Sequence, residues 1–258
     1  MKQIYVGSVK RAKLFTKINQ TVRIPHIVQA IIIALLVTIP SIGAKKIFKI
    51  GGKMSPVAYV STSRGSGSGV LVSNNHILTA AHVVYGMYEG DMCKVDFYDP
   101  NNPDAIPVHA VAKLKVMGNY SPNDPLTNQD FALLELVHAN GSSFATPYTL
   151  GNSQNVKVKD GVHAIGFPGV SVGYASITSM ESMPGEINNI SGGWLKDNDF
   201  FVADCKVTHG YSGGALEDNN GKLIGLIIGG FSDPSNPSYT QNFFLKINVV
   251  KKALSAYL

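Results

Sequence analysis

The stretch His209-Gly210-Tyr211-Ser212-Gly213-Gly214-Ala215 is the most informative part of this 258-residue chain. A serine with glycine at positions −2, +1 and +2 can lie on a tight turn that exposes its hydroxyl. The backbone N–H groups of Gly210 and Ser212 can then point to one place beside that hydroxyl. An acyl-transfer nucleophile needs this geometry, because preorganised donors stabilise the negative oxygen of the tetrahedral intermediate.

Two runs upstream supply the base and the carboxylate that such a serine requires. Thr79-Ala80-Ala81-His82 follows the lead-in Gly67-Ser68-Gly69-Val70, and Asp130-Phe131-Ala132-Leu133-Leu134 lies between His82 and Ser212. A serine hydroxyl is a poor nucleophile at neutral pH, and a neutral imidazole has the basicity to activate it. A carboxylate on the other ring nitrogen fixes the tautomer and stabilises the imidazolium. We therefore predict Ser212 as the nucleophile, His82 as the general base and Asp130 as its partner.

The three runs, in the chain order His, Asp, Ser, resemble the motifs of the trypsin-like (chymotrypsin-fold) serine peptidases. The Gly-Ser-Gly-Val lead-in and the run at 210–216 are most similar to the Do-like (HtrA) bacterial proteases and their glutamyl endopeptidase relatives. The resemblance covers residues 56–250. It implies a serine endopeptidase that cleaves polypeptides through an acyl-enzyme intermediate. It also implies an active site between two β-barrels, with the N–H groups of Gly210 and Ser212 as the oxyanion hole.

Composition favours an all-β fold. The chain has 26 Gly, 13 Pro and 15% charged residues, and its short apolar runs are separated by Gly, Pro, Asn and Asp clusters. Asp218-Asn219-Asn220-Gly221 predicts a hairpin turn, and residues 248–257 predict a helix. The predicted strands are residues 57–62, 69–73, 76–79, 94–98, 108–116, 131–136, 161–167, 172–179, 200–207, 223–228 and 243–247.

These strands suffice for two six-stranded antiparallel β-barrels. The polar stretches 139–143 and 151–153 form the predicted linker, so the first barrel spans 56–140 and the second 150–247, followed by the C-terminal helix 248–257. His82 and Asp130 then belong to the first barrel and Ser212 to the second. Residues 54–258 together form the predicted peptidase domain.

The N-terminal region, residues 1–53, has a different character. Residues 27–44 are almost entirely apolar, and basic residues flank them on both sides. The region has no acidic residue and holds ten of the 22 basic ones, which leaves 12 basic and 17 acidic residues in the rest of the chain. The net charge of +5 therefore comes from this region. Its basicity favours contact with anionic lipid headgroups and not nucleic-acid binding.

Residues 27–44 predict an N-terminal membrane helix at the short end of the spanning length. The 26 residues before it are long for a cleaved signal peptide, so an uncleaved anchor is favoured. The small residues at 40–44 leave signal cleavage and secretion as the alternative. The excess of basic residues before the segment places the N-terminus inside and the peptidase domain on the extracytoplasmic face.

The resemblance also locates the primary substrate pocket, just before Ser212 and along the strand that follows residue 225. No acidic residue lies there to bind Arg or Lys, and Ile227 or Ile228 replaces the histidine that glutamyl endopeptidases use. An apolar or small residue before the scissile bond is favoured, with an acidic residue as the alternative if Lys206 reaches into the pocket. The predicted pocket residues are Lys206, Val207, Thr208, Ile227, Ile228, Gly229 and Gly230, with His209 at the rim.

The remaining candidates predict neither a cofactor nor a metal site. Cys93 and Cys205 have no Cys-x-x-Cys pattern, and they are either one disulfide or two buried thiols. No metal-binding spacing connects the histidines His76, His109, His138 and His163.

Ile50-Gly51-Gly52 resembles the new N-terminus of activated digestive proteases, in which an ammonium pairs with a carboxylate next to the catalytic serine. Residue 211 is a tyrosine here, and a buried ammonium without its partner is costly. We therefore predict that the site forms without cleavage of the chain.

Two other functions remain open at this stage. Residues 208–213 also resemble the aromatic-containing serine loop of sobemovirus-type proteases, which would make the chain a viral polyprotein-processing protease on the cytosolic face of host membranes. The other alternative is a catalytically inactive protease fold that serves as a binding module. The presence of all three predicted catalytic residues argues against it. The sequence predicts no oligomeric state.

Overall fold

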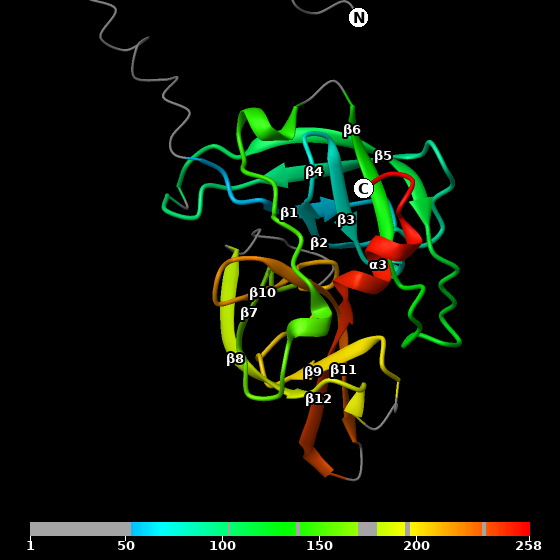
Figure 1. The fold of residues 1–258 in the computed structure, drawn as a ribbon. Helices are drawn as coiled ribbons and strands as arrows, with labels where there is room; N and C mark the ends of the chain where they lie inside the picture. The colour runs from blue at the N-terminus through cyan, green and yellow to red at the C-terminus, as the bar shows by residue number, and fades with distance from the viewer. Residues whose placement is uncertain (1–52, 103, 138–139, 170–179, 194–196, 234–235) are drawn as a thin grey trace, which may run out of the picture. The chain divides into compact units, whose positions relative to one another are not determined.

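The computed structural model describes residues 53–102, 104–137, 140–169, 180–193, 197–233 and 236–258 (Figure 1). The chain divides into two units, Met1–Ile50 and Gly51–Leu258, and the described residues all belong to the second. The predicted membrane segment at 27–44 lies outside the described residues. Within the described ranges, no helix has both the length and the apolar character needed to cross a membrane.

The first six strands form a closed antiparallel barrel. Its strand order is β1-β2-β3-β6-β5-β4, and pairing of β1 with β4 closes it, with Ala58 opposite Phe97. The strands are β1 Val57–Ser61, β2 Ser66–Leu71, β3 His76–Thr79, β4 Met92–Phe97, β5 Val108–Met117 and β6 Ala132–Val137.

The other six strands form a second closed antiparallel barrel. Its strand order is β10-β11-β12-β9-β8-β7, closed by pairing of β10 with β7. Figure 1 shows it in yellow to orange beside the blue-to-green first barrel. The strands are β7 Gly161–Gly166, β8 Glu181–Asn189, β9 Phe200–Ala203, β10 Ala215–Asp218, β11 Leu223–Asp233 and β12 Asn236–Lys246. The predicted all-β fold with two six-stranded barrels and a C-terminal helix is confirmed.

Among the residues that the structure describes, buried apolar side chains form three clusters. One lies inside the first barrel around Val95, Phe97 and Leu134, and another lies inside the second barrel around Phe201 and Phe244. The third joins the barrels, because it combines side chains of both: Val57, Val70, Leu78 and Leu133 with Phe200, Leu226, Phe243 and Leu245. Burial of this apolar surface holds the two barrels together and thereby fixes how the residues of one barrel face those of the other.

Several predicted boundaries were wrong. The C-terminal helix α3 spans Ile247–Ala253 and not 248–257, because Leu254 leaves the helical conformation. The sequence prediction missed β8 and β10, lengthened β9 and shortened β11 and β12. The predicted strand at 172–179 lies outside the described residues. Two short 3-10 helices, Gly141–Ser143 and Ser153–Asn155, lie between β6 and β7 in the predicted linker.

The two cysteines are not paired. Both are free and buried, Cys93 in the cluster of the first barrel and Cys205 in that of the second. Burial raises the pKa of each thiol to about 11. Of the two alternatives that the sequence left open, the structure supports separate buried thiols.

Candidate active site

Strand pairing in the first barrel brings His82 and Asp130 together. Thr79 at the end of β3 lies opposite Ala132 at the start of β6, so the residues just beyond these two strand ends are neighbours. His82 lies in the 3-10 helix Ala81–Val84, and its Nδ1 is 2.7 Å from Oδ2 of Asp130. The backbone N–H of His82 donates to the other carboxylate oxygen at 3.0 Å. Asp130 is fully buried, whereas the His82 side chain is 27% exposed.

This arrangement determines which nitrogen of His82 can act as a base. A carboxylate only accepts hydrogen bonds, so the nitrogen facing Asp130 carries the proton and Nε2 keeps its lone pair. Nε2 is thus the ring nitrogen that can accept a proton from a neighbouring hydroxyl. Asp130 fixes this tautomer by geometry, with both of its oxygens bound to one residue.

The loop that carries Ser212, residues 209–214 just before β10, is called the serine loop here. It belongs to the second barrel and contacts the first barrel directly. The carbonyl of Ser212 accepts from the N–H of Ser68 in β2 at 2.7 Å. Gly213 has a φ of 82°, and a Cβ at this position would lie 2.8 Å from the backbone N of Ala80, two residues before His82. Only glycine permits so close an approach. The nucleophile predicted from sequence is therefore held against the chain segment that carries the predicted base.

Gly210 leaves a free backbone donor beside Ser212. The His209 carbonyl accepts from Gly169 N–H, and because the peptide is trans, the Gly210 N–H points to the opposite side. Gly210 has a φ of 93°, and a Cβ there would clash with Phe167 and Gly169. Neither Gly210 N–H nor Ser212 N–H has an acceptor among the residues that the structure describes. Two unpaired donors on one tight turn are suited to an oxyanion.

Ser68 secures this turn from the first barrel. Its buried hydroxyl donates to the Gly210 carbonyl at 2.8 Å and accepts from the Phe167 N–H at 2.9 Å. One side chain thus connects β2, the end of β7 and the serine loop. Ser68 is part of the sequence motif Gly67-Ser68-Gly69, but the motif alone does not predict that its hydroxyl bonds to Gly210 and Phe167.

His82 and Ser212 line one cavity of about 550 Å³. The cavity has an apolar wall, since Ile227 and Ile228 are almost fully buried. Its lining residues are His82, Tyr120, Pro125, Leu126, Val207, Thr208, His209, Ser212, Ile227, Ile228, Gly229, Gly230, Phe231 and Asn242. None of these is Asp, Glu, Lys or Arg.

A comparison with protein families identifies the chain. Residues 67–226 match the model of the trypsin-like peptidase domain, over more than half of the chain and across all three predicted catalytic residues. The chain belongs to the trypsin-like peptidase domain family.

Curated relatives of this trypsin-like peptidase domain are bacterial proteases. Glutamyl endopeptidase from Staphylococcus epidermidis is 26% identical over 194 residues, which are 70% of this chain and 60% of that protein. A probable periplasmic serine protease, do/HhoA-like, from Haemophilus influenzae is 28% identical over 165 residues, 63% of this chain and 30% of the relative. The chain thus spans 60% of the length of the first relative and 30% of the second.

Solved structures of similar fold include two proteases. The HtrA-type protease AlgW in complex with a tripeptide has a TM-score of 0.57 and 25% identity, covering 78% of this chain and 59% of that one. The MamO protease domain from Magnetospirillum magneticum has a TM-score of 0.55 and 16% identity, covering 77% and 95%. The second likeness concerns the fold alone.

Most of the residues predicted for the substrate pocket line this same cavity. Seven of the eight residues predicted for pocket and rim line the cavity, with His209 exposed at its edge. Lys206 is the exception: its side chain is exposed and does not line the cavity. The described lining of this cavity thus contains neither Lys nor Arg.

Part of the cavity wall in this peptidase domain consists of residues outside the predicted set. Tyr120 contacts the predicted base, with ring centroids 5.8 Å apart, and Tyr85 packs on Tyr120 at 5.6 Å. Three of these wall residues lie in the loop before Asp130, within ten residues of it: Tyr120, Pro125 and Leu126. Their nearness in sequence to the predicted catalytic aspartate is the one feature that could have indicated them.

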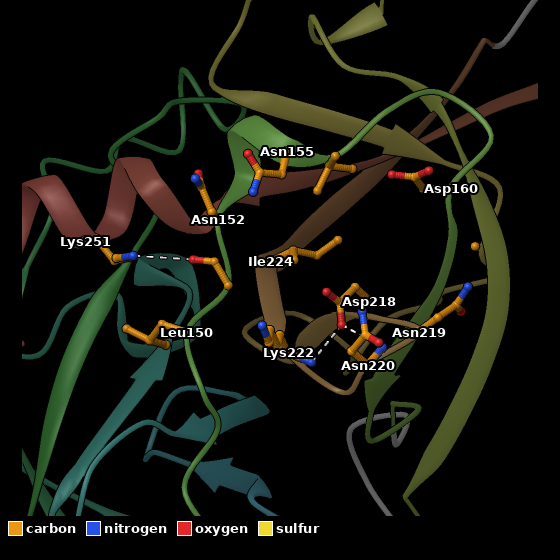
Figure 2. Close-up of a pocket in the computed structure, with 13 residues that line it drawn as sticks. Leu150, Asn152, Asn155, Asp160, Asp218, Asn219, Asn220, Lys222, Ile224 and Lys251 are labelled. Carbon is orange, nitrogen blue, oxygen red and sulfur yellow. Dashed lines mark hydrogen bonds between the residues drawn. The ribbon is translucent and has the colours of Figure 1, made fainter.

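A second hollow of about 630 Å³ lies on the second barrel and contains none of the predicted site residues. Figure 2 shows its polar lining, with Lys251 Nζ near the Gly151 carbonyl and Asp218 accepting from backbone N–H groups of its own turn. These hydrogen bonds stabilise the turn of the β10–β11 hairpin, so the Asp218 carboxylate has a structural role at this place.

Proposed function

We propose that this peptidase domain is a serine endopeptidase in which Ser212, His82 and Asp130 act together. Ser212 Oγ attacks the scissile carbonyl carbon while its proton passes to Nε2 of His82. His82 then protonates the leaving amine, and an acyl-enzyme forms. The same nitrogen then takes a proton from water, which attacks the ester, and His82 returns that proton to Ser212 Oγ as the acid product leaves. The 2.7 Å contact between His82 and Asp130, on the cavity that Ser212 also lines, carries this proposal.

The tetrahedral intermediates of both steps place a negative oxygen beside Ser212. The N–H groups of Gly210 and Ser212 are proposed to bind it. Their lack of acceptors among the described residues supports this role, since the donors need no rearrangement before they bind the oxyanion.

The proposed substrate is a polypeptide with an apolar residue before the scissile bond. The cavity walls formed by Val207, Ile227 and Ile228 favour such a side chain. A charged substrate side chain would lose its hydration there without meeting an opposite charge, which is unfavourable. The relative named glutamyl endopeptidase has a different specificity by name. The isoleucines and the exposed Lys206 distinguish this chain from it.

Residues 27–44 are proposed to anchor the peptidase in a membrane, with the catalytic domain on the extracytoplasmic face. Their apolar composition and basic flanks support an anchor, and a relative named as periplasmic supports the location. Alkaline carbonate extraction and intact mass test both parts. A membrane-bound protein of full mass is expected, whereas a soluble protein cut near residue 44 would show a cleaved signal peptide.

The bacterial origin of the relatives favours a cellular protease over a viral polyprotein protease. Hydrolysis of fluorescein-labelled casein by the full chain tests the peptidase function, with Ser212→Ala as the control. We expect casein fragments whose new C-termini are mainly Val, Leu, Ile or Phe, and none from the variant. An intact casein pool with the folded wild-type chain would favour the inactive binding module.

A further inference from the structure

Tyr211, the residue just before the predicted nucleophile, extends into the second barrel. Its side chain is 1% exposed and is among the largest fully buried side chains of the described residues. Its hydroxyl donates to Oε2 of Glu181 at 3.0 Å. A polar hydroxyl in such a place needs a partner, and Glu181 at the start of β8 provides it.

The barrel is built to receive this ring. Gly166 at the end of β7 lies opposite Glu181 in the β7–β8 pairing, so the register places the acceptor beside the ring. A Cβ at Gly166 would lie 2.9 Å from Cδ1 of Tyr211, so a larger residue would displace the ring. Apolar side chains of the second barrel, including Val162, Leu216 and Ile227, belong to the same buried cluster. Packing therefore fixes the ring of Tyr211, and the hydrogen bond to Glu181 fixes its hydroxyl.

The backbone on both sides of Tyr211 carries the proposed oxyanion donors. The Gly210 N–H precedes it and the Ser212 N–H follows it directly. The Tyr211 N–H donates to the Thr208 carbonyl at 3.3 Å, and its carbonyl accepts from Gly214 N–H at 2.8 Å. Anchoring the side chain at its far end limits rotation about the Tyr211 backbone, and this rotation would turn the Ser212 N–H away.

We propose that the Tyr211–Glu181 hydrogen bond positions the serine loop, so that Tyr211 and Glu181 are positioning residues for catalysis by Ser212. This inference rests on the proposed function. The hydrogen bond between the buried Tyr211 and the partly buried Glu181 would keep both oxyanion donors directed at the substrate carbonyl. No cleavage of the chain is needed to form this contact.

The donor is available at every pH at which the enzyme would work. Burial, and next to it the hydrogen bond with Glu181, raise the pKa of the Tyr211 hydroxyl well above its ordinary value. The hydroxyl therefore keeps its proton at neutral pH and remains a donor.

The structure offers a matched control for this contact. Tyr148 also donates to a glutamate, Oε2 of Glu217, at 3.0 Å, and burial raises the pKa of its hydroxyl as well. Tyr148 lies in the linker between the barrels and does not line the cavity. The variants Tyr211→Phe and Tyr148→Phe thus each remove a tyrosine hydroxyl that donates to a glutamate, one directly before the nucleophile in the chain and one outside the cavity lining.

The test measures how fast a fluorophosphonate probe acylates the full-length chain in detergent micelles, with the maximal rate kinact separated from the binding constant KI. We expect Tyr211→Phe to lower kinact about tenfold with KI unchanged, as for one lost charge-assisted hydrogen bond. Tyr148→Phe should keep the wild-type kinact, even if both variants lose similar thermal stability. Glu181→Gln, which keeps an acceptor oxygen, should react faster than Glu181→Ala.

The double variant Tyr211→Phe/Glu181→Ala should be no slower than Glu181→Ala alone, because the two side chains act through one contact. Equal kinact values for wild type and Tyr211→Phe would contradict this inference while leaving the peptidase function intact. Equal losses in Tyr211→Phe and Tyr148→Phe would likewise reduce the contact to a general contribution to stability. A folded wild type that does not react at all would contradict the proposed function and, with it, this role of Tyr211.

Discussion

Asp130 holds His82 at two points: one carboxylate oxygen lies 2.7 Å from Nδ1 of the ring, and the other accepts the backbone N–H at 3.0 Å. The carboxylate is fully buried, two residues before the start of β6. It therefore fixes both the ring and the main chain of the histidine. On this basis, the imidazole is ready to accept a proton before any substrate arrives.

Replacing Asp130 by Asn should preserve the fold and remove most of the activity. The amide oxygen can still accept from the backbone of His82, but the amide NH₂ would then face Nδ1 and force the ring proton onto Nε2. We expect kcat to fall about 10⁴-fold, as for other triads with the wrong tautomer. Casein hydrolysis measures the loss, and circular dichroism controls for folding. A variant with more than a tenth of wild-type activity would contradict the assigned role of Asp130.

Removing the hydroxyl of Ser68 should affect both stability and catalysis. Ser68→Ala leaves the Phe167 N–H and the Gly210 carbonyl without their partner, at a cost of about 2 kcal/mol in the free energy of unfolding. Because the Gly210 carbonyl belongs to the serine loop, the rate of acylation should fall as well. Urea unfolding and fluorophosphonate kinetics measure the two effects separately.

Ser153→Ala is the matched control for Ser68→Ala. Ser153 is also buried and bonds to two backbone groups, the Ile224 carbonyl and the Asn248 N–H, away from the cavity. It should lose comparable stability and keep the acylation rate. A Ser68→Ala variant that matches it in both measurements would show that Ser68 has no influence on the serine loop.

The apolar cavity predicts the order of preference among short peptide substrates. In a series that differs only in the residue before the scissile bond, kcat/KM should be at least about tenfold higher for Val, Leu or Phe than for Glu or Lys, because a buried charge would be unpaired. Lys206→Ala should leave the ratio between Leu and Glu unchanged, since Lys206 is exposed outside the cavity. A preference for Glu that disappears in Lys206→Ala would restore the acidic alternative.

The two thiols should be present and unreactive in the folded protein. With a pKa of about 11, each thiol is a thiolate in about one molecule per thousand at pH 8. Ellman's reagent should therefore react about 100-fold more slowly with the native chain than with the chain in guanidinium, where two thiols per chain should appear. A denatured, unreduced protein with no titratable thiol would instead indicate a disulfide.

The two-barrel fold and the catalytic candidates could be predicted because their signals are local. Alternating apolar residues predicted most strands, and the residues around His82, Asp130 and Ser212 formed recognisable motifs. β8 was missed because Glu181–Asn189 contains Pro184 and Gly185 and its pattern of burial is mostly partial or exposed. Its place is determined by pairing with β7 and β9, which no local pattern encodes.

The parts of the site that escaped prediction depend on distant contacts. Ser68 bonds to residues 99 and 142 positions away, and Tyr211 meets Glu181 across 30 positions. The sequence showed Tyr211 as an aromatic residue in place of a carboxylate, but it gave no partner for the hydroxyl; in the fold, this hydroxyl donates to Glu181. Lys206 illustrates the converse: it lies near Ser212 in sequence, yet its exposed side chain does not line the cavity.

The most direct test of the account is the site at which a fluorophosphonate modifies the full-length chain, identified by mass spectrometry of the labelled peptides. We predict one modified residue, Ser212, in the wild type, and almost complete loss of labelling in both His82→Ala and Ser212→Ala. Labelling of Ser212 that persists at the wild-type rate in folded His82→Ala would contradict the account, as would a folded wild type in which Ser212 stays unmodified.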